Sequence, residues 1–260
     1  MKKDYNVENF DYENYYYFLD DGKYFKISKG VSPERFYELN NEFYHKTDSD
    51  MFRYLFEDGQ FPYEKPFYKT LVFDLDKVEN DTKTSFLKFV QGLMNRIELL
   101  ELRNKTIAFY FEDYQLDFRS IFKTVNDDLG VSIKVFESGM INANNNDAFR
   151  TLFEAYLKNS YSNSRLYTTT SELVLDIAKK NINQLKVLKP IILNNVYKDT
   201  QLEKLILSMF ENNLNVTQTA KDVFMHRNTI NNKLEFIRKQ TNLNIQNFQE
   251  AVAMYLLLKN

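Results

Sequence analysis

The stretch that most constrains the fold is residues 215–240, NVTQTAKDVFMHRNTINNKLEFIRKQ. Its first half carries apolar residues at the i, i+4, i+7 and i+8 spacing of one helix face: Val216, Ala220, Val223 and Phe224. Its second half repeats a helical spacing with Ile230, Leu234 and Ile237, and the letters FMHR between the halves leave room only for a turn. Two helices this short bury little apolar surface alone, so the pattern predicts a helical pair inside a larger helical core.

The side of the second helix that faces away from its apolar stripe is polar. It carries cations and amides: Arg227, Asn228, Asn231, Asn232 and Lys239. A helix-turn-helix lays such a surface in the major groove, with the first residues of the second helix on base edges. Arginine can pair with guanine and asparagine with adenine, so these residue types favour direct readout of DNA sequence.

This stretch and the residues around it resemble a known family. The segment TAKDVFMHRNTINNKLEFIRKQTNLNIQNFQEAVAMYLLL is similar to the C-terminal helix-turn-helix of PucR and CdaR-type bacterial transcription regulators, and the likeness covers roughly residues 185–258. The hallmarks are Ala220 in the first helix and the His-Arg-Asn-Thr start of the second, here residues 226–229. Where the family usually has Tyr-Arg, this chain has Asn232 and Lys233. Lysine keeps a point charge but lacks the planar fork of arginine, which affects base preference there but not groove binding.

The resemblance and the polar face together give a set of DNA-binding candidates: Thr217, Gln218, His226, Arg227, Asn228, Thr229, Asn231, Asn232, Lys233 and Lys239. We predict that Arg227, Asn231 and Asn232 read bases. The residues predicted to hold the DNA backbone are Thr217, Gln218, Lys233 and Lys239. His226 either contacts a phosphate or caps the second helix. No cofactor and no metal are expected.

Charge is unevenly distributed along the chain. Residues 215–240 carry five basic and two acidic residues, a local charge of +3, whereas the whole chain has a net charge of −2. A local basic face on an acidic protein suits confined contact with double-stranded DNA. Because the excess is modest, we expect a homodimer that presents two copies, with contacts through a long helix at 81–102 and a helix starting near Ser171. A small-molecule effector could bind the N-terminal part and change the spacing of the two copies.

Four regions of an α+β protein follow one another. The expected order is an aromatic-rich N-terminal region, an α/β domain, a helical connector and a helix-turn-helix domain, at residues 1–65, 66–145, 146–198 and 199–260. The element order of the second region, strand 68–75, helix 81–102, strand 105–112, helix 117–129 and strand 131–137, resembles the degenerate GGDEF-like middle domain of CdaR-type regulators. The GGDEF motif itself does not occur, so cyclase activity is not implied.

In the first region, Asp21-Gly22 predicts a type I′ hairpin between strands 15–19 and 23–28. Ser32 and Pro33 predict the start of a helix. The surrounding aromatic residues are interpreted as a core, with a small-molecule pocket as the alternative: Tyr12, Tyr15, Tyr16, Tyr17, Phe18, Tyr24 and Phe25.

The helices that flank the central pair have their own signals. Thr200 and Glu203 predict a capping box at the start of the helix before the pair. A last helix at about 245–258 is expected to offer four residues to the shared core: Phe248, Val252, Tyr255 and Leu256.

Two other functions remain as alternatives. TLVFDLDK resembles the first motif of HAD-type phosphatases, in which Asp74 would be the nucleophile and Asp76 the acid/base beside Mg²⁺. The family follows with Gly-Thr where this chain has Lys-Val, so we interpret both carboxylates as lying at the solvent end of a strand and expect no enzyme. The second alternative is a protein-interaction module whose helix-turn-helix no longer binds DNA. There is no cysteine, no apolar signal segment and no stretch that could span a membrane, so we expect a cytoplasmic protein without membrane contact.

Overall fold

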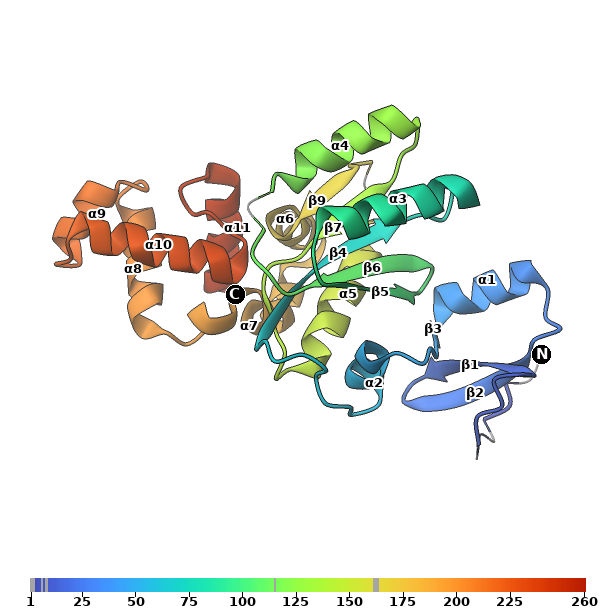
Figure 1. Ribbon diagram of the computed structural model, residues 1–260. Coiled ribbons are helices and arrows are strands. Elements are labelled where there is room, and N and C mark those ends of the chain that lie inside the picture. The colour runs from blue at the N-terminus through green and yellow to red at the C-terminus, as the bar shows by residue number, and fades with distance from the viewer. Residues whose placement is uncertain (1–2, 6, 8, 115, 161–163) are drawn as a thin grey trace. The chain divides into compact units, whose positions relative to one another are not determined.

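The computed structural model describes the chain except residues 1–2, 6, 8, 115 and 161–163. The fold is α+β, as expected. Two compact units divide it: residues 1–64 with 71–135, and residues 65–70 with 136–260 (Figure 1). We refer to them as the first and the second unit. None of the described helices is long and apolar enough to cross a membrane.

The first unit begins with a small antiparallel sheet. Strands β1 (Tyr15–Asp20), β2 (Lys23–Ser28) and β3 (Tyr44–His45) lie in the order β2-β1-β3. Asp21 and Gly22 both have positive φ, 46° and 76°, which confirms the type I′ turn. Helix α1 (Pro33–Glu42) starts where Ser32 Oγ accepts the Arg35 N–H at 3.3 Å, also as expected.

Aromatic residues form the core of this region. Phe18 and Phe25 are fully buried, and Leu39 of α1 and Phe43 pack against them. Tyr17 is buried as well, Tyr15, Tyr16 and Tyr24 are half-buried, and Tyr12 is 45% exposed, so only part of the cluster is core. This supports the interpretation of the cluster as packing.

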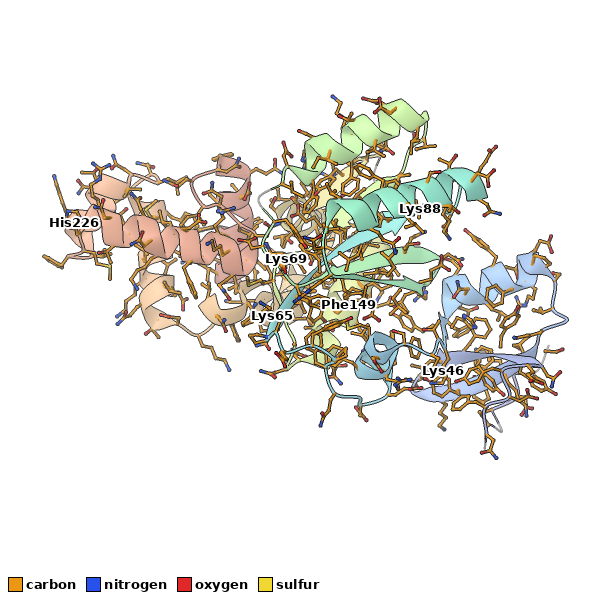
Figure 2. The ribbon with its side chains drawn as sticks, viewed as in Figure 1. Lys46, Lys65, Lys69, Lys88, Phe149 and His226 are labelled. Carbon is orange, nitrogen blue, oxygen red and sulfur yellow. The ribbon has the colours of Figure 1, made fainter. Side chains whose placement is uncertain are left out.

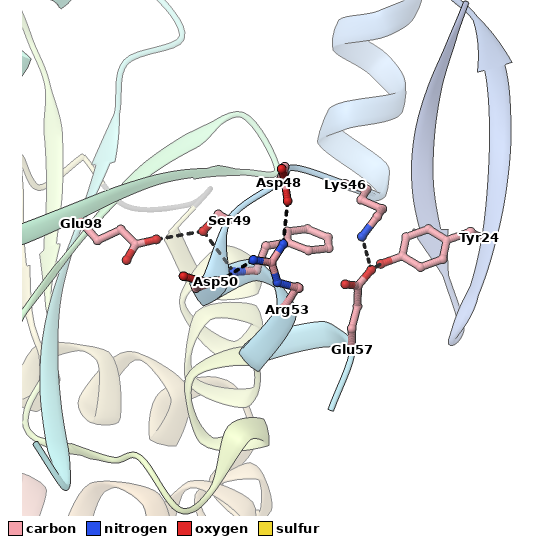
Figure 3. A network of polar contacts seen from close by, with 9 residues as sticks. Tyr24, Lys46, Asp48, Ser49, Asp50, Arg53, Glu57 and Glu98 are labelled. Atoms are coloured by element: carbon pink, nitrogen blue, oxygen red, sulfur yellow. Dashed lines mark hydrogen bonds and ion pairs between the residues drawn. The ribbon is translucent and has the colours of Figure 1, made fainter. Parts of the chain in front are cut away.

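Helix α2 (Asp50–Phe56) carries a polar network beside this core (Figure 3). Glu57 accepts hydrogen bonds from the buried Lys46 ammonium and from the Tyr24 hydroxyl, the latter at 2.5 Å. Ser49 Oγ donates to Glu98 at 2.8 Å. Burial raises the pKa of Glu57, but the bonds from Lys46 and Tyr24 outweigh it and leave that pKa below its ordinary value.

A second sheet follows. Its strands are β4 (Phe67–Asp74), β5 (Ile97–Leu102), β6 (Lys105–Tyr110), β7 (Lys134–Glu137) and β9 (Tyr167–Thr169), in the order β5-β6-β4-β7-β9, and β8 (Ile141–Asn142) pairs with β4. Helices α3 (Asn80–Leu93) and α4 (Phe118–Leu129) pack on it through Phe86 and Phe122, which both contact Phe73 of β4. Asp117 caps α4 and Gly130 ends it in the left-handed conformation.

The prediction of one long helix at residues 81–102 is wrong. Helix α3 ends at Leu93, and Ile97–Leu102 forms β5, which is joined to β6 by the positive-φ pair Arg103 and Asn104. Leu100 and Leu102 are buried while Glu101 between them is exposed, which is the alternation of a strand. The apolar residues from 97 to 102 fit helical spacing almost as well, and the turn has neither glycine nor proline to mark it.

The second unit is mostly helical. Its helices are α5 (Asn146–Ser160), α6 (Thr170–Asn181), α7 (Leu185–Leu193), α8 (Thr200–Glu211), α9 (Val216–Asp222), α10 (Arg227–Thr241) and α11 (Phe248–Lys259), with short 3₁₀ turns at 182–184 and 194–196. Helix α11 packs on α6 and α7 as well as lying beside the helix-turn-helix, so the core extends beyond the last four helices. Asp199, not Thr200, caps α8 by accepting the N–H groups of Gln201 and Leu202.

The prediction of which residues of α11 are buried is also wrong. Phe248 is 79% and Tyr255 44% exposed, and the buried residues of the helix are Ala251, Ala253, Met254 and Leu257. The helix begins three residues later than expected, because Asn247 caps it. Its two buried alanines allow close approach to α6, which the choice of large residues as core did not anticipate.

Candidate nucleic-acid interface

Helix α10 begins and ends at identifiable signals. His226 is its N-cap: Nδ1 accepts the Asn228 N–H at 3.3 Å, so the capping alternative for this residue is realised. Asn242 ends the helix in the left-handed conformation with φ 56°. Ile230, Leu234 and Ile237 are buried, as their spacing predicts.

The opposite side of α10 gathers the candidate residues on one exposed surface. The exposed ones are Arg227, Asn228, Thr229, Asn231, Asn232 and Lys239, and Lys233 is half-buried at their edge. We call this set the polar face of α10. His226 lies at one end of the second unit, where α9 meets α10 (Figure 2). The first turn of α10 is therefore free to approach a partner.

In the first turn of helix α9, only side chains are available to contact a partner, because the backbone N–H groups there are already bonded. Asn215 caps it, and its Oδ1 accepts the N–H groups of Thr217 and Gln218 at 3.0 and 3.1 Å. These N–H groups are thus already bonded, while both side chains are exposed. Thr219 is fully buried, although the sequence pattern did not select it for the core. Threonine is polar, so the hydrophobic pattern did not identify Thr219 as a core residue.

Phe224 departs from the expected apolar face of α9. The helix ends at Asp222, and the chain closes it with two backbone bonds: Met225 N–H to Ala220 O at 3.0 Å and Phe224 N–H to Lys221 O at 3.3 Å. These are the two bonds of a Schellman motif, and they place Phe224 at its left-handed position with φ 53°. The side chain is 95% exposed, because the reversal of the chain turns it away from the core.

Acidic groups near the polar face are already bonded within the domain. Asp222 Oδ2 accepts a hydrogen bond from Asn212 Nδ2 at 2.6 Å. Glu235 accepts two bonds from Arg238, at 2.8 and 2.6 Å, and the pKa of Glu235 is lowered chiefly by them. By contrast, Lys221, Arg227 and Lys233 have no acidic partner within 4.0 Å in the part of the chain that the structure describes. Three cations are left for an external anion.

The far end of α10 is anchored inside the second unit. Gln240 Oε1 accepts a bond from Asn195 Nδ2 at 2.9 Å, and Thr241 is fully buried. Gly139, in the loop between β7 and β8, lies so close that a Cβ there would be 2.7 Å from Thr241 O. Sequence reasoning missed this contact. The only signal was a lone glycine between two strands, which is typical of close backbone approach.

The two carboxylates of the phosphatase alternative are bonded to a lysine. Lys105 Nζ, on a side chain 7% exposed, lies 3.1 Å from Asp74 Oδ1 and 2.6 Å from Asp76 Oδ2. Burial lowers the pKa of Lys105, but the hydrogen bond to Asp76 and the charges of both carboxylates raise it above its ordinary value. An ammonium ion thus lies between these two carboxylates, where the alternative would require Mg²⁺. No cluster of three metal-ligating side chains occurs among the described residues.

Comparison with known proteins agrees with the geometry of the interface. Residues 202–259 match the PucR C-terminal helix-turn-helix domain, a segment that begins in α8 and ends in α11. A comparison with curated proteins found no match. A crystal structure of a regulator of polyketide synthase expression from Bifidobacterium adolescentis is similar at 14% identity and a TM-score of 0.36, over 76% of this chain and 81% of that one. A similarity of this size does not establish a common fold. The C-terminal part of the chain is thus similar to a PucR-type helix-turn-helix domain.

Proposed function

We propose that the protein is a sequence-specific DNA-binding transcription regulator, because residues 202–259 match the PucR C-terminal helix-turn-helix domain. The observation that carries this proposal is the polar face of α10. Amides and cations are exposed on one side of this helix, while Ile230, Leu234 and Ile237 fix the other side in the core. A helix held in this way can enter the major groove without losing its own packing.

The proposed roles follow the position of each residue on the two helices. Arg227, Asn231 and Asn232 lie on the first exposed turns of α10 and read base edges. The remaining candidates contact the sugar-phosphate backbone or border these contacts: Thr217, Gln218, His226, Asn228, Thr229, Lys233 and Lys239. For Thr217 and Gln218 the contact is made by the side chains, since their N–H groups are bonded to Asn215.

We further propose that the protein acts as a homodimer. Three cations without acidic partners give one copy a weak electrostatic attraction to DNA, and two copies would bind half-sites about 34–36 Å apart. Of the two predicted contact surfaces, the helix near Ser171 is present as α6 and packs against α11, whereas residues 81–102 do not form one helix. The dimer contact that we propose lies outside the helix-turn-helix. A small-molecule effector would act by changing the spacing of the two copies.

The proposed regulator binds chromosomal DNA, so we expect it in the cytoplasm. No enzymatic step forms part of this function. The pairing of Asp74 and Asp76 with Lys105 supports a structural role for these carboxylates.

Selection of bound sequences from a random duplex library by the full chain tests this proposal. A regulator that reads bases enriches a short motif, repeated as two half-sites if the protein is a dimer. The enriched duplex is then used in mobility-shift titrations, with sedimentation of the free protein to determine its oligomeric state. Absence of any enrichment at low salt, with the protein folded, would favour the alternative of an interaction module that no longer binds DNA.

A further inference from the structure

Among the described residues, Phe224 is the most exposed large apolar residue, at 95%. It lies in the turn between α9 and α10, three residues before Arg227. Its whole ring is in contact with solvent, although the two residues beside it, Val223 and Met225, are partly buried. An isolated phenylalanine adds nothing to the stability of the fold in this position.

The backbone at Phe224 is also unfavourable for this residue type. Its φ of 53° lies in the left-handed region, which a Schellman motif normally fills with glycine or asparagine. A bulky side chain with positive φ is uncommon in proteins, and such conformations occur most often at functional positions. The sequence therefore retains a large aromatic ring where the fold itself favours glycine.

The surroundings of Phe224 indicate the chemistry of its partner. Lys221 and Arg227 flank the turn without an acidic partner among the described residues, while Asp222 is bonded to Asn212 of α8. A partner at this point must therefore offer anionic groups and an apolar group together. Duplex DNA does so in the major groove, where phosphates border the C5-methyl groups of thymine.

We propose that Phe224 packs against the C5-methyl group of a thymine at the edge of each half-site, next to the base read by Arg227. This inference rests on the proposed function, since it needs α10 in the major groove. It adds an apolar contact to a surface that otherwise consists of amides and cations. Phe224 then determines specificity at a base pair that none of the polar candidates reads.

Selections from the same random library with the wild-type chain and with Phe224→Gly test the proposal. Glycine suits the left-handed position, so the variant should fold and its thermal unfolding midpoint should not fall. The wild-type protein should enrich thymine at one position of each half-site, and the variant should lose this enrichment while retaining the rest of the motif. Phe248→Ala, which removes another exposed phenylalanine from α11, is the matched control and should leave the motif unchanged.

Replacement of that thymine by uracil removes only the methyl group. The wild-type protein should then bind about ten-fold more weakly, and Phe224→Gly should show the same loss on the thymine site but no further loss on the uracil site. Equal affinities of wild type and variant for the thymine site would overturn this inference and leave the proposed function intact. A loss in the variant that is independent of the methyl group would overturn it as well, because the ring would then contact the sugar-phosphate backbone. Failure of the wild-type protein to select any DNA would overturn the proposed function and the inference together.

Discussion

In the first unit, buried lysines lie against acidic side chains, whereas in the second unit the cations near the turn between α9 and α10 have no such partners among the described residues. Lys46 bonds Glu57, and Lys105 bonds Asp74 and Asp76. At the turn between α9 and α10, Lys221, Arg227 and Lys233 are without acidic neighbours among the described residues, and the nearby Asp222 and Glu235 are bonded to other groups.

The buried and the exposed cations thus have different roles in this protein. A buried ammonium must be paired, because desolvation of an isolated charge is costly. An exposed cation without a partner costs the fold little, and its field remains available to an anion. The overall charge of −2 hides this contrast, and only the position of each charge in the structure reveals it.

The largest effect should come from breaking the internal pairing. Lys105→Ala leaves Asp74 and Asp76 beside each other without a cation, and we expect it to lower the free energy of unfolding by about 3–5 kcal/mol. Lys83→Ala is the control. It breaks the more exposed pair with Glu101 and should cost less than about 1 kcal/mol. Urea unfolding of both variants measures the two effects, and equal losses would mean that burial does not distinguish these pairs.

The next largest effect concerns a half-buried imidazole that stays neutral in the folded chain. His45 packs against Tyr16, Phe18 and Phe36, and burial lowers its pKa from 6.5 to about 4, with a smaller opposing effect from Glu101. Between these two values the unfolded chain binds a proton that the folded chain does not. Stability should therefore fall as the pH falls from 6.5 towards 4, by about 3 kcal/mol in all.

Two variants isolate this contribution of His45. His45→Phe should flatten the stability profile between pH 6.5 and 4. His226→Asn, which replaces the chain's other histidine by a residue that can also cap α10, should retain the slope. Unfolding free energies at several pH values measure both, and an unchanged slope in His45→Phe would assign the effect to other groups.

A smaller effect is expected at the contact that fixes the far end of α10. Gly139→Ala would place its Cβ 2.7 Å from Thr241 O, at the anchored end of α10. We expect a loss of about 2 kcal/mol in unfolding free energy and weaker DNA binding, although Gly139 lies outside the polar face. Gly92→Ala in α3, where nothing lies within 4 Å, should be neutral or stabilising. Wild-type stability in Gly139→Ala would show that the loop moves away at no cost.

The smallest expected effect on stability concerns an exposed acidic residue of α10. Glu235→Gln removes the acid that bonds Arg238 and lies 4.0 Å from Lys239. The pair is exposed, so unfolding free energy should change by less than about 0.5 kcal/mol. The change removes one negative charge beside the polar face, so affinity for DNA should rise at low salt and the gain should shrink as salt is added. Titrations at several salt concentrations check this, and an unchanged affinity at low salt would place Glu235 away from the bound DNA.

The sequence predicted the parts that depend on local signals. The turn at Asp21-Gly22, the cap at Ser32 and the Ile230–Leu234–Ile237 stripe all depend on residues close together in the chain. The α+β class followed from them.

Other features depend on contacts that are distant in sequence. Strand β5 was read as helix because its apolar residues fit both periods, and only pairing with β6 decides between them. The burial of α11 is set by α6, and the exposure of Phe224 by one Schellman turn. The candidate residues on α10 were found because one helix carries them all, whereas the anchor at Gly139 joins residues about a hundred positions apart.

The central claim is that the polar face of α10 reads DNA. The most direct test is the affinity of Arg227→Ala for the selected duplex and for random duplex, measured beside Lys88→Ala, an exposed lysine of α3 (Figure 2). Arg227→Ala should bind the selected site about 1–3 kcal/mol more weakly with little change on random DNA, and Lys88→Ala should bind both like wild type. Equal losses on both duplexes, or no loss on either, would contradict base reading by this face.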